Sequence, residues 1–259
     1  MAGVPGVRVR LGTLAAILLF WMIVSTGSSS LGFPGPIRVG EAFVALLASG
    51  ELLRALSVTF GSFAAGAALA ILVGIPLGTL MGVQPWLGRA IDPYLTGLYI
   101  MPFSAVIPLL VLWFGIDEFV RIVFIFLFTL PQIAIVCYQG ARETPTTLVD
   151  VARTLHASNV QIFRKLVLPH EIGYVFTALR LGTGLAIQGM VVSELLIASV
   201  RGLGNLIRLA SARLDLASVL AVVLFVMLLG IAMVSLMQRI ENAVTPWRRS
   251  TTITGETHA

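Results

Sequence analysis

The stretch FVRIVFIFLFTLPQIAIVCYQG, residues 119–140, carries one charged side chain in its 22 residues. A helix needs about 20 mostly apolar residues to cross the hydrocarbon core of a bilayer. The stretch therefore predicts a membrane-spanning helix. Its Pro131 removes a backbone donor in an apolar setting, which is tolerated where neighbouring protein or a water-lined cavity satisfies the freed carbonyl groups.

The segments on either side of this stretch have the same composition. Of the 259 residues, 58% are hydrophobic and 11% are charged, whereas soluble domains carry roughly 25% charged residues. We therefore predict an all-α integral membrane protein with about six transmembrane helices. The predicted spans are residues 11–26, 56–82, 94–114, 119–140, 172–198 and 216–238.

Three connecting segments have the composition of turns or of a membrane interface. Residues 27–40 are rich in Gly, Ser and Pro and predict a loop, and residues 83–93 predict a short loop bounded by Pro. Residues 41–54 have apolar residues at helical spacing, which suits a helix lying along the interface.

The first apolar segment has two interpretations. Arg8 and Arg10 precede a run of about 14 apolar residues, a pattern that a signal peptide and a retained first span share. Trp21 and Met22 make a poor cleavage site, so we expect the segment to be retained. Cleavage would leave five spans.

The sequence offers little for catalysis, metal binding or nucleic-acid recognition. The lone Cys137 lies in an apolar run, and His156, His170 and His258 have no metal-ligand spacing. HExxH, GxSxG and the phosphate loop GxxxxGK(S/T) do not occur. The basic residues are scattered rather than gathered in a stripe. We expect no catalytic residue, metal, cofactor or nucleic-acid partner; an intramembrane enzyme, an ion channel and a membrane scaffold are the alternative classes.

Basic residues are more frequent on one side of the predicted spans. Ten lie in segments that are cytoplasmic if the N-terminus is inside, against six on the opposite side, and cytoplasmic loops hold the excess of positive charge. The basic cluster at 142–165 weighs most and places the polar loop 141–169 and both termini in the cytoplasm. The opposite side holds Arg38, Arg54, Arg121, Arg201, Arg208 and Arg213.

Glycines recur every fourth residue in the second predicted span, at Gly74, Gly78 and Gly82. This spacing gives one flat helix face that lets a neighbouring helix approach closely. We interpret the face as a packing surface, and a translocation path lined by the same helices is compatible with it.

The segment DVARTLHASNVQIFRKLVLP, residues 150–169, is the longest patterned part of the polar loop. Val151, Leu155, Ile162 and Leu166 recur near one face of a helix. The segment predicts a short amphipathic helix, a bend and a second helix that leads into a membrane span. Periodicity alone fits a helix lying on the membrane and a helix docked into a partner protein equally well.

The same segment resembles the signature of binding-protein-dependent ABC permeases: a Glu-Ala-Ala triplet, a Gly four residues later, and an Ile-x-Leu-Pro ending. The matching positions are Asp150, Val151 and Ala152, then His156, then Leu166, Val167, Leu168 and Pro169. In that family the segment is a coupling helix seated in a cleft of the ATPase subunit. The resemblance therefore implies an ATPase-coupling site made of Asp150, Val151, Ala152, Leu155, His156, Ile162, Leu166, Leu168 and Pro169.

The resemblance covers roughly residues 50–247 and is closest to the sulfonate, taurine and nitrate branch, through motifs such as Trp113-Phe114-Gly115 and Gly202-Leu203-Gly204. It implies a type I ABC importer permease (MetI-like) fold. An N-terminal span with a periplasmic or interfacial segment would occupy 1–55, the permease core with coupling loop 141–169 would occupy 56–240, and a cytoplasmic tail would occupy 241–259.

The function implied by this resemblance is import of a small solute across the inner membrane by alternating access, with ATP hydrolysed by a partner. The implied partners are two ABC ATPase subunits, a substrate-binding protein and a second permease, either identical or related. The implied solutes are sulfonates, taurine, nitrate or a related organic anion or vitamin precursor.

Two positions depart from the family signature. Asp150 replaces Glu and keeps the charge, whereas His156 replaces a Gly that permits a left-handed bend. His is among the non-glycine residues enriched at positive φ, so we expect the bend to persist. His156 could instead tune the ATPase contact or titrate near neutral pH.

Two ionisable residues fall within the fifth predicted span. Arg180 and Glu194 are 14 positions apart, about 21 Å by helix rise, and therefore cannot pair with each other. Arg180 is placed to snorkel toward the cytoplasmic interface, and Glu194 to cap packing or gate the path near the outer end. With Gln188 and Ser193 they make this span the predicted lining of the translocation path.

Overall fold

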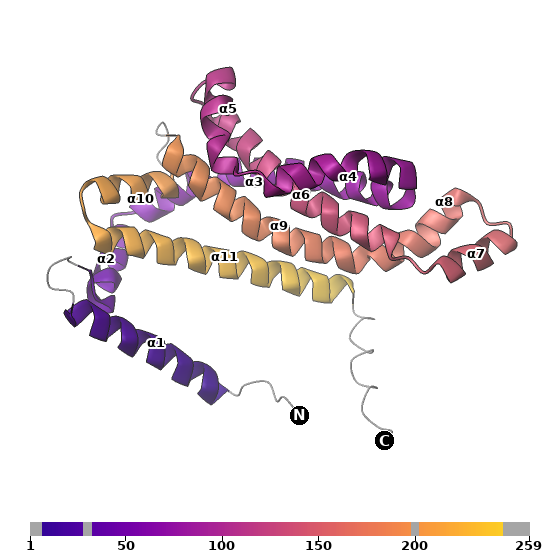
Figure 1. Cartoon of the computed structure of the whole chain (residues 1–259). Helices are drawn as coiled ribbons and strands as arrows, with labels where there is room; N and C mark the ends of the chain where they lie inside the picture. Colours follow the sequence, from indigo (N-terminus) through magenta and orange to yellow (C-terminus); the bar gives the residue numbers. More distant parts are fainter. Residues whose placement is uncertain (1–6, 28–32, 198–201, 246–259) are drawn as a thin grey trace. The chain divides into compact units, whose positions relative to one another are not determined.

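The computed structural model describes residues 7–27, 33–197 and 202–245, and all the regular structure in these ranges is helical (Figure 1). The helices are α1 (Val7–Gly27), α2 (Pro36–Ala48), α3 (Glu51–Val83), α4 (Pro85–Ile100), a 3-10 turn (Phe103–Ala105), α5 (Ile107–Phe114), α6 (Glu118–Arg142), α7 (Thr146–Thr154), α8 (Asn159–Ile162), a π-helical segment (Phe163–Val167), α9 (Leu168–Leu196), α10 (Leu203–Ala212) and α11 (Leu216–Val244).

Four helices of the described residues are long and apolar enough to cross a membrane, and a bent helix pair raises the number to five. The four are Glu51–Val83, Glu118–Arg142, Asn159–Leu196 and Leu216–Val244. The apolar helix Leu11–Thr26 is shorter than these. The predicted fold class is confirmed, whereas the count of six spans differs from what the helix lengths support.

The predicted span 94–114 is wrong as a single helix. The chain bends by 82° between the helix ending at Ile100 and the one that begins at Phe103. The physical cause is Pro102, because the residue before a proline is pushed out of the α region, and Met101 is indeed extended, with ψ 135°.

Two predicted loops are partly helical. The loop predicted at 83–93 belongs almost entirely to α4, and the one predicted at 27–40 overlaps the start of α2. Both helices have a proline in their first turn, Pro85 and Pro36. A proline there costs no hydrogen bond, so it starts a helix as readily as it bounds a loop.

The described residues form two compact units, one made of 7–27, 33–58 and 202–227 and the other of 59–197 and 228–245. In the first unit, Phe43 of α2 packs against Phe225 of α11. Leu214 has φ 56° and ends α10. Asp215 then caps α11 by accepting hydrogen bonds from the Ser218 amide and hydroxyl, which lower the pKa of its carboxyl group.

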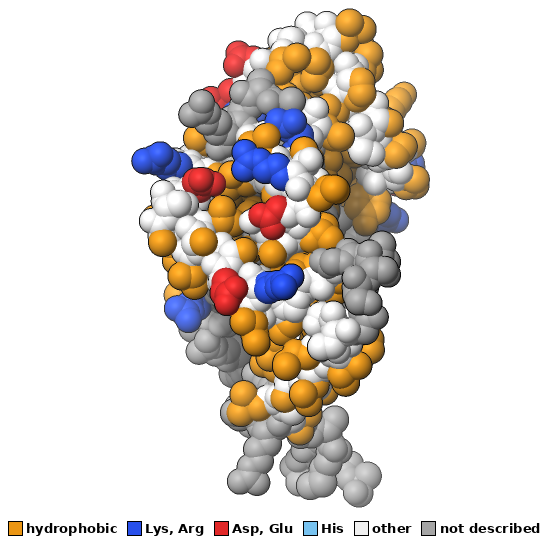
Figure 2. All heavy atoms as spheres, turned by 90° about the vertical axis from the view of Figure 1, so that its left-hand side faces the viewer, with side chains coloured by type: hydrophobic (Ala, Val, Ile, Leu, Met, Phe, Trp, Pro, Cys, Tyr) orange, Lys and Arg blue, Asp and Glu red, His pale blue; other side chains and the backbone are white. Residues whose placement is uncertain are grey.

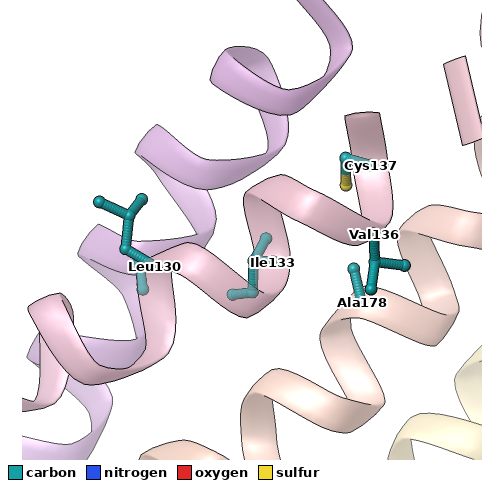
Figure 3. Packing of buried hydrophobic residues seen from close by; sticks show 6 residues of the cluster. Leu130, Ile133, Val136, Cys137 and Ala178 are labelled. Atoms are coloured by element: carbon teal, nitrogen blue, oxygen red, sulfur yellow. The ribbon is translucent and has the colours of Figure 1, made fainter. Parts of the chain in front are cut away.

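The core of the second unit lies where α6 packs between α3 and α9. Leu130, Ile133, Val136 and Cys137 of α6 are buried with Ala178 of α9 (Figure 3). Since α6 meets protein on two sides, more than half of its most apolar window is buried inside the chain (56%).

The glycine face of α3 packs against α6, as predicted. A Cβ added at Gly78 would lie 2.2 Å from the Ala134 carbonyl oxygen, and one at Gly82 would lie 2.4 Å from the Ala141 Cβ. A Cβ at Gly74 would lie 2.9 Å from Cγ2 of the Ile133 side chain. These positions have no room for a side chain, because the two backbones are nearly in contact.

Within this unit, α3, α6 and α9 form a bundle with two ends. At one end, here called the network end, the Thr59 hydroxyl of α3 donates a hydrogen bond to Glu194 of α9. At the other, the hairpin end, Gly82 of α3 lies against Ala141 of α6, just before α7 begins.

The bent pair connects these two ends. α4 starts near the hairpin end, where Gly88 lies close to Tyr138. α5 packs near the network end in a cluster that includes Val120 of α6 and Ile197 after α9. The pair therefore runs the length of the bundle despite its bend.

Many large hydrophobic side chains of the described residues are exposed. Only 11% of the most apolar window of α11 is buried within the chain, and the face in Figure 2 shows charged side chains scattered among hydrophobic ones. Such a surface is stable only against lipid or other apolar protein.

Candidate functional site

A helical hairpin made of α7 and α8 joins α6 to α9 (Figure 1). It begins after Pro145 and contains most of the polar loop predicted from the sequence. None of the α7 side chains is buried. Asp150 and Arg153 lie one turn apart on its exposed surface, with 3.8 Å between their charged atoms.

The bend after α7 is a left-handed helix ending built on His156. Its φ is 59°, so the expected left-handed conformation at this position is confirmed. The His156 amide donates to the Arg153 carbonyl at 2.9 Å, and the Ala157 amide donates to the Ala152 carbonyl at 2.9 Å. This pair of bonds is a Schellman motif, which satisfies the last carbonyl groups of α7.

The second half of the hairpin starts at Ser158 with a capping box. The Ser158 hydroxyl accepts from the Gln161 amide, and the Gln161 side chain accepts from the Ser158 amide. These reciprocal bonds fix the start of α8.

α8, the π-helical segment and α9 form one uninterrupted helix of 38 residues, Asn159–Leu196. The sequence predicted a separate second helix before the span. The π-helical hydrogen bond from the Leu168 amide to the Phe163 carbonyl precedes Pro169. We attribute the wider turn to Pro169, whose ring displaces the carbonyl four residues before it and leaves that carbonyl without an α-helical partner.

The predicted apolar face of the hairpin is divided in two. Val151 and Leu155 are 58% and 75% exposed, and Leu148 and Val160 are exposed as well. Ile162 is buried within the chain instead. Of the remaining predicted coupling residues, Ala152 and Leu166 are half-buried, and Asp150, His156, Leu168 and Pro169 are exposed.

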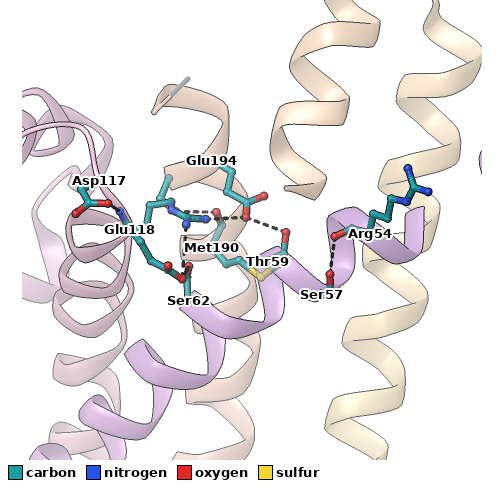
Figure 4. A network of polar contacts seen from close by, with 10 residues as sticks. Arg54, Ser57, Thr59, Ser62, Asp117, Glu118, Met190 and Glu194 are labelled. Carbon is teal, nitrogen blue, oxygen red and sulfur yellow. Dashed lines mark hydrogen bonds and ion pairs between the residues drawn. The ribbon is translucent and has the colours of Figure 1, made fainter. Parts of the chain in front are cut away.

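A buried ion pair lies at the network end of the bundle (Figure 4). The Arg121 guanidinium donates from Nη1 to Glu194 Oε1 at 3.3 Å, and both side chains are almost fully buried. The Thr59 hydroxyl donates to the same Glu194 oxygen at 2.8 Å. Glu194 thus joins α3, α6 and α9.

The sequence predicted Arg121 to lie on the membrane side opposite the polar loop, and it did not predict that the side chain is buried. Arg121 is 1% exposed. The signal was present, because it is the one charge in the stretch 119–140, and an isolated charge in a span implies a partner. That partner is 73 residues away in the sequence, at Glu194, and spacing alone could not identify it.

The other predicted path residues do not converge on Glu194. Arg180 pairs with Glu241 of α11, so it is held by a partner and does not simply snorkel. Gln188 is exposed, and Ser193 is buried with its hydroxyl donating to the Met190 carbonyl. As expected, Arg180 and Glu194 do not pair with each other.

Glu171 is a further buried carboxylate that sequence analysis did not identify. Its Oε1 accepts a hydrogen bond from the Thr79 hydroxyl at 2.6 Å, and this contact joins α9 to α3 near the hairpin end. A carboxylate two residues after Pro169, the end of the predicted loop, gives no signal of burial in the sequence.

The fold and the two sites define a class: a multi-pass membrane protein of helical bundle type, with buried charges between its helices and a polar hairpin outside them. A family model described as binding-protein-dependent transport system inner membrane component matches residues 70–246. The chain belongs to this family, and it is the permease component of an ABC importer.

Several proteins named as ABC permeases are similar to the chain over most of its length. A probable ABC transporter permease of Brucella abortus is 30% identical over 95% of this chain and 98% of its own. The taurine transport system permease TauC of Escherichia coli is 29% identical over 93% and 90%, respectively. The putative aliphatic sulfonates transport permease SsuC of Bacillus subtilis is 30% identical over 91% and 86%.

A solved structure has the same fold. The MetNI methionine ABC transporter matches with a TM-score of 0.66 and 21% identity, over 75% of this chain and 96% of the matched one. The expected permease fold is therefore confirmed. The family consists of transport permeases and not of enzymes, and within the described residues no cluster of His, Cys, Asp or Glu could hold a metal ion.

Proposed function

We propose that the α7–α8 hairpin docks into a separate ABC ATPase, and that ATP binding and hydrolysis there drive alternating access in this chain. The solute is a small anion of the sulfonate, taurine or nitrate kind, or a related organic anion or vitamin precursor. Relatives named for taurine, aliphatic sulfonates and nitrate support this range of solutes.

The observation that carries the proposal is the exposed apolar face of the hairpin. Leu148, Val151 and Leu155 extend from α7, Val160 extends from α8, and none of them is covered by the chain. Each such side chain gains about 1.5–3 kcal/mol when it is fully buried. A protein cleft that covers all four therefore contributes about 6–12 kcal/mol toward docking, against which the entropy cost of association is set.

The hairpin is also held in shape before any partner binds. The Schellman motif at His156 and the capping box at Ser158 fix the turn between the two helices. A pre-formed element loses less conformational entropy on binding, so these bonds favour docking over a helix that folds only on the membrane.

The assembly we infer contains two ATPase subunits, two permeases and one substrate-binding protein, with this chain as a homodimer or paired with a related permease. The hairpin and both termini lie on the cytoplasmic side. The excess of basic residues in 142–165 supports this orientation.

Co-purification tests the docking directly. The chain is expressed with its ATPase partner and purified in detergent, as wild type and as Val151→Arg. We expect wild type to retain the ATPase and the variant to lose it, because an arginine buried in an apolar cleft is left unpaired. Uptake of labelled taurine, methanesulfonate and nitrate by the same complex in vesicles then identifies the solute.

Thr146→Arg is the matched control, because Thr146 is exposed and lies on the opposite side of α7. It introduces the same charge without touching the apolar face. Retention of the ATPase by Val151→Arg, or its equal loss in both variants, would contradict docking through this face.

A further inference from the structure

Arg121 lies between two carboxylates at the network end. It donates from Nη1 to Glu194 at 3.3 Å, and its Nη2 is 3.8 Å from Glu118 Oε1. The first contact is a hydrogen bond, whereas the second is an ion pair just beyond hydrogen-bond distance. Nε of Arg121 is buried and has no hydrogen-bond partner in the described structure. The guanidinium therefore has donors to spare for a second carboxylate.

The two carboxylates belong to different helices. Glu118 is one turn before Arg121 on α6 and moves with it, whereas Glu194 is on α9. Relative movement of α6 and α9 therefore stretches the contact with Glu194 and leaves the contact with Glu118 intact.

Each carboxylate also has a hydroxyl partner on α3. The Thr59 hydroxyl donates to Glu194 at 2.8 Å, and the Ser62 hydroxyl donates to Glu118 at 3.1 Å (Figure 4). Thr59 and Ser62 are three residues apart, so they lie on one face of α3. When Arg121 leaves Glu194, that carboxylate still keeps a hydrogen bond from Thr59.

Movement at the hairpin reaches this network through α9. The helix is continuous from Asn159 to Leu196, and at a rise of 1.5 Å per residue Glu194 lies about 50 Å along it from Asn159. A shift of α8 is therefore transmitted to Glu194, while Arg121 and Glu118 stay with α6.

We propose that Arg121 exchanges its carboxylate partner during the transport cycle, from Glu194 in the arrangement described here to Glu118 when α9 moves away from α6. Without a substitute partner the buried guanidinium would be left with uncompensated charge, which is strongly unfavourable. Glu118 compensates the charge of Arg121, so α9 can move away from α6 without leaving the guanidinium unpaired. This inference rests on the proposed function, because it requires the ATPase-driven movement of α9.

The role of Glu118 is tested in the full complex with its ATPase in lipid vesicles, with ATP as the probe. Glu118→Gln keeps the shape and the Ser62 contact but removes the charge. We expect kcat for ATP hydrolysis to fall about tenfold, the effect of one lost charge-assisted hydrogen bond. The KM for ATP and the amount of co-purified ATPase should not change, because neither the nucleotide site nor the hairpin is altered.

Two further variants separate exchange from a merely structural role. Glu118→Asp retains the charge and should restore most of kcat, whereas Glu41→Gln removes an exposed carboxylate of α2 and should have no effect. An unchanged kcat in Glu118→Gln, or a kcat in Glu118→Asp as low as in Glu118→Gln, would overturn the exchange. The proposed function, by contrast, is contradicted if the wild-type chain retains no ATPase.

Discussion

His156 shows how one backbone angle shapes the hairpin. Its φ of 59° lies in the left-handed region, where a residue with a side chain is less stable by about 1–2 kcal/mol. The Schellman bonds of His156 and Ala157 compensate for this cost by satisfying the last carbonyl groups of α7. The hairpin therefore keeps its bend without the glycine that the family signature has at this position.

Replacement of His156 should change the stability of the bend in a predictable direction. His156→Gly relieves the strain and should strengthen protection of the Ala157 amide by about 1 kcal/mol, or roughly fivefold in hydrogen exchange. His156→Val should weaken it, because β-branched residues are the least tolerant of positive φ. Hydrogen-exchange mass spectrometry of peptides covering 153–160 measures both, and equal protection in wild type and His156→Val would refute the explanation.

Single residues were predictable where local geometry decides them. The left-handed conformation of His156 follows from its place in a motif that requires a bend, so sequence was sufficient. The pairing of Arg121 with Glu194 and of Arg180 with Glu241 depends on which helices become neighbours. No local pattern contains that information.

At the scale of elements, the contact between α3 and α6 depends on the absence of side chains. Gly78 faces the Ala134 carbonyl at a distance where any Cβ would overlap it. Unlike a flexible side chain, a backbone carbonyl cannot rotate away. The two helices would have to separate along the part of the core where α6 is most buried.

Gly78→Ala should therefore destabilise the chain although alanine favours helices. We expect a loss of about 1–3 kcal/mol from overpacking, seen as a fall of about 2–10 °C in the melting temperature of the purified chain in detergent. Gly184→Ala is the matched control, because nothing lies within 4 Å of a Cβ at Gly184 in α9. It should leave the melting temperature unchanged or raise it. Equal effects of the two substitutions would contradict the packing argument.

The elements themselves were predicted well where apolar runs are long and uniform. The stretch 119–140 lies within α6, and 216–238 lies within α11. Prediction failed where proline has two opposite effects. Pro85 was interpreted as bounding a loop and instead starts α4, whereas Pro102 falls in an apolar run and breaks it. Composition cannot separate these cases, because the outcome depends on the turn of helix in which each proline falls.

At the scale of the whole molecule, the bent pair decides how many times the chain crosses the membrane. Its beginning lies near the hairpin end and its end near the network end, within one compact unit. A pair that returns to its starting side would leave α3 and α6 crossing in opposite directions. Instead, Gly66 of α3 lies against Ile125 in the first half of α6, and Gly82 lies against Ala141 near its end, so the two helices run in the same direction. This is the arrangement that a crossing pair produces.

Accessibility to a membrane-impermeant thiol reagent tests this crossing. Gln84 and Ile116 flank the pair and are both exposed, so Gln84→Cys and Ile116→Cys should be labelled from opposite sides of the membrane. Labelling of each variant is measured in intact and in permeabilised cells. The chain without either substitution is the control, because its Cys137 is buried. Labelling of both positions from the same side would show that the pair is re-entrant.

The buried ion pair has a consequence for how the chain is made. Arg121 is synthesised 73 residues before Glu194, which at 5–20 residues per second is about 4–15 s. During that interval α6 enters the bilayer while the partner of its arginine has not yet been translated. An arginine at the centre of a span raises the insertion free energy by about 2.5–3.5 kcal/mol, and less near its end. Arg121 is in the first turn of α6, beside Glu118, so this helix can be released into lipid before α9 exists.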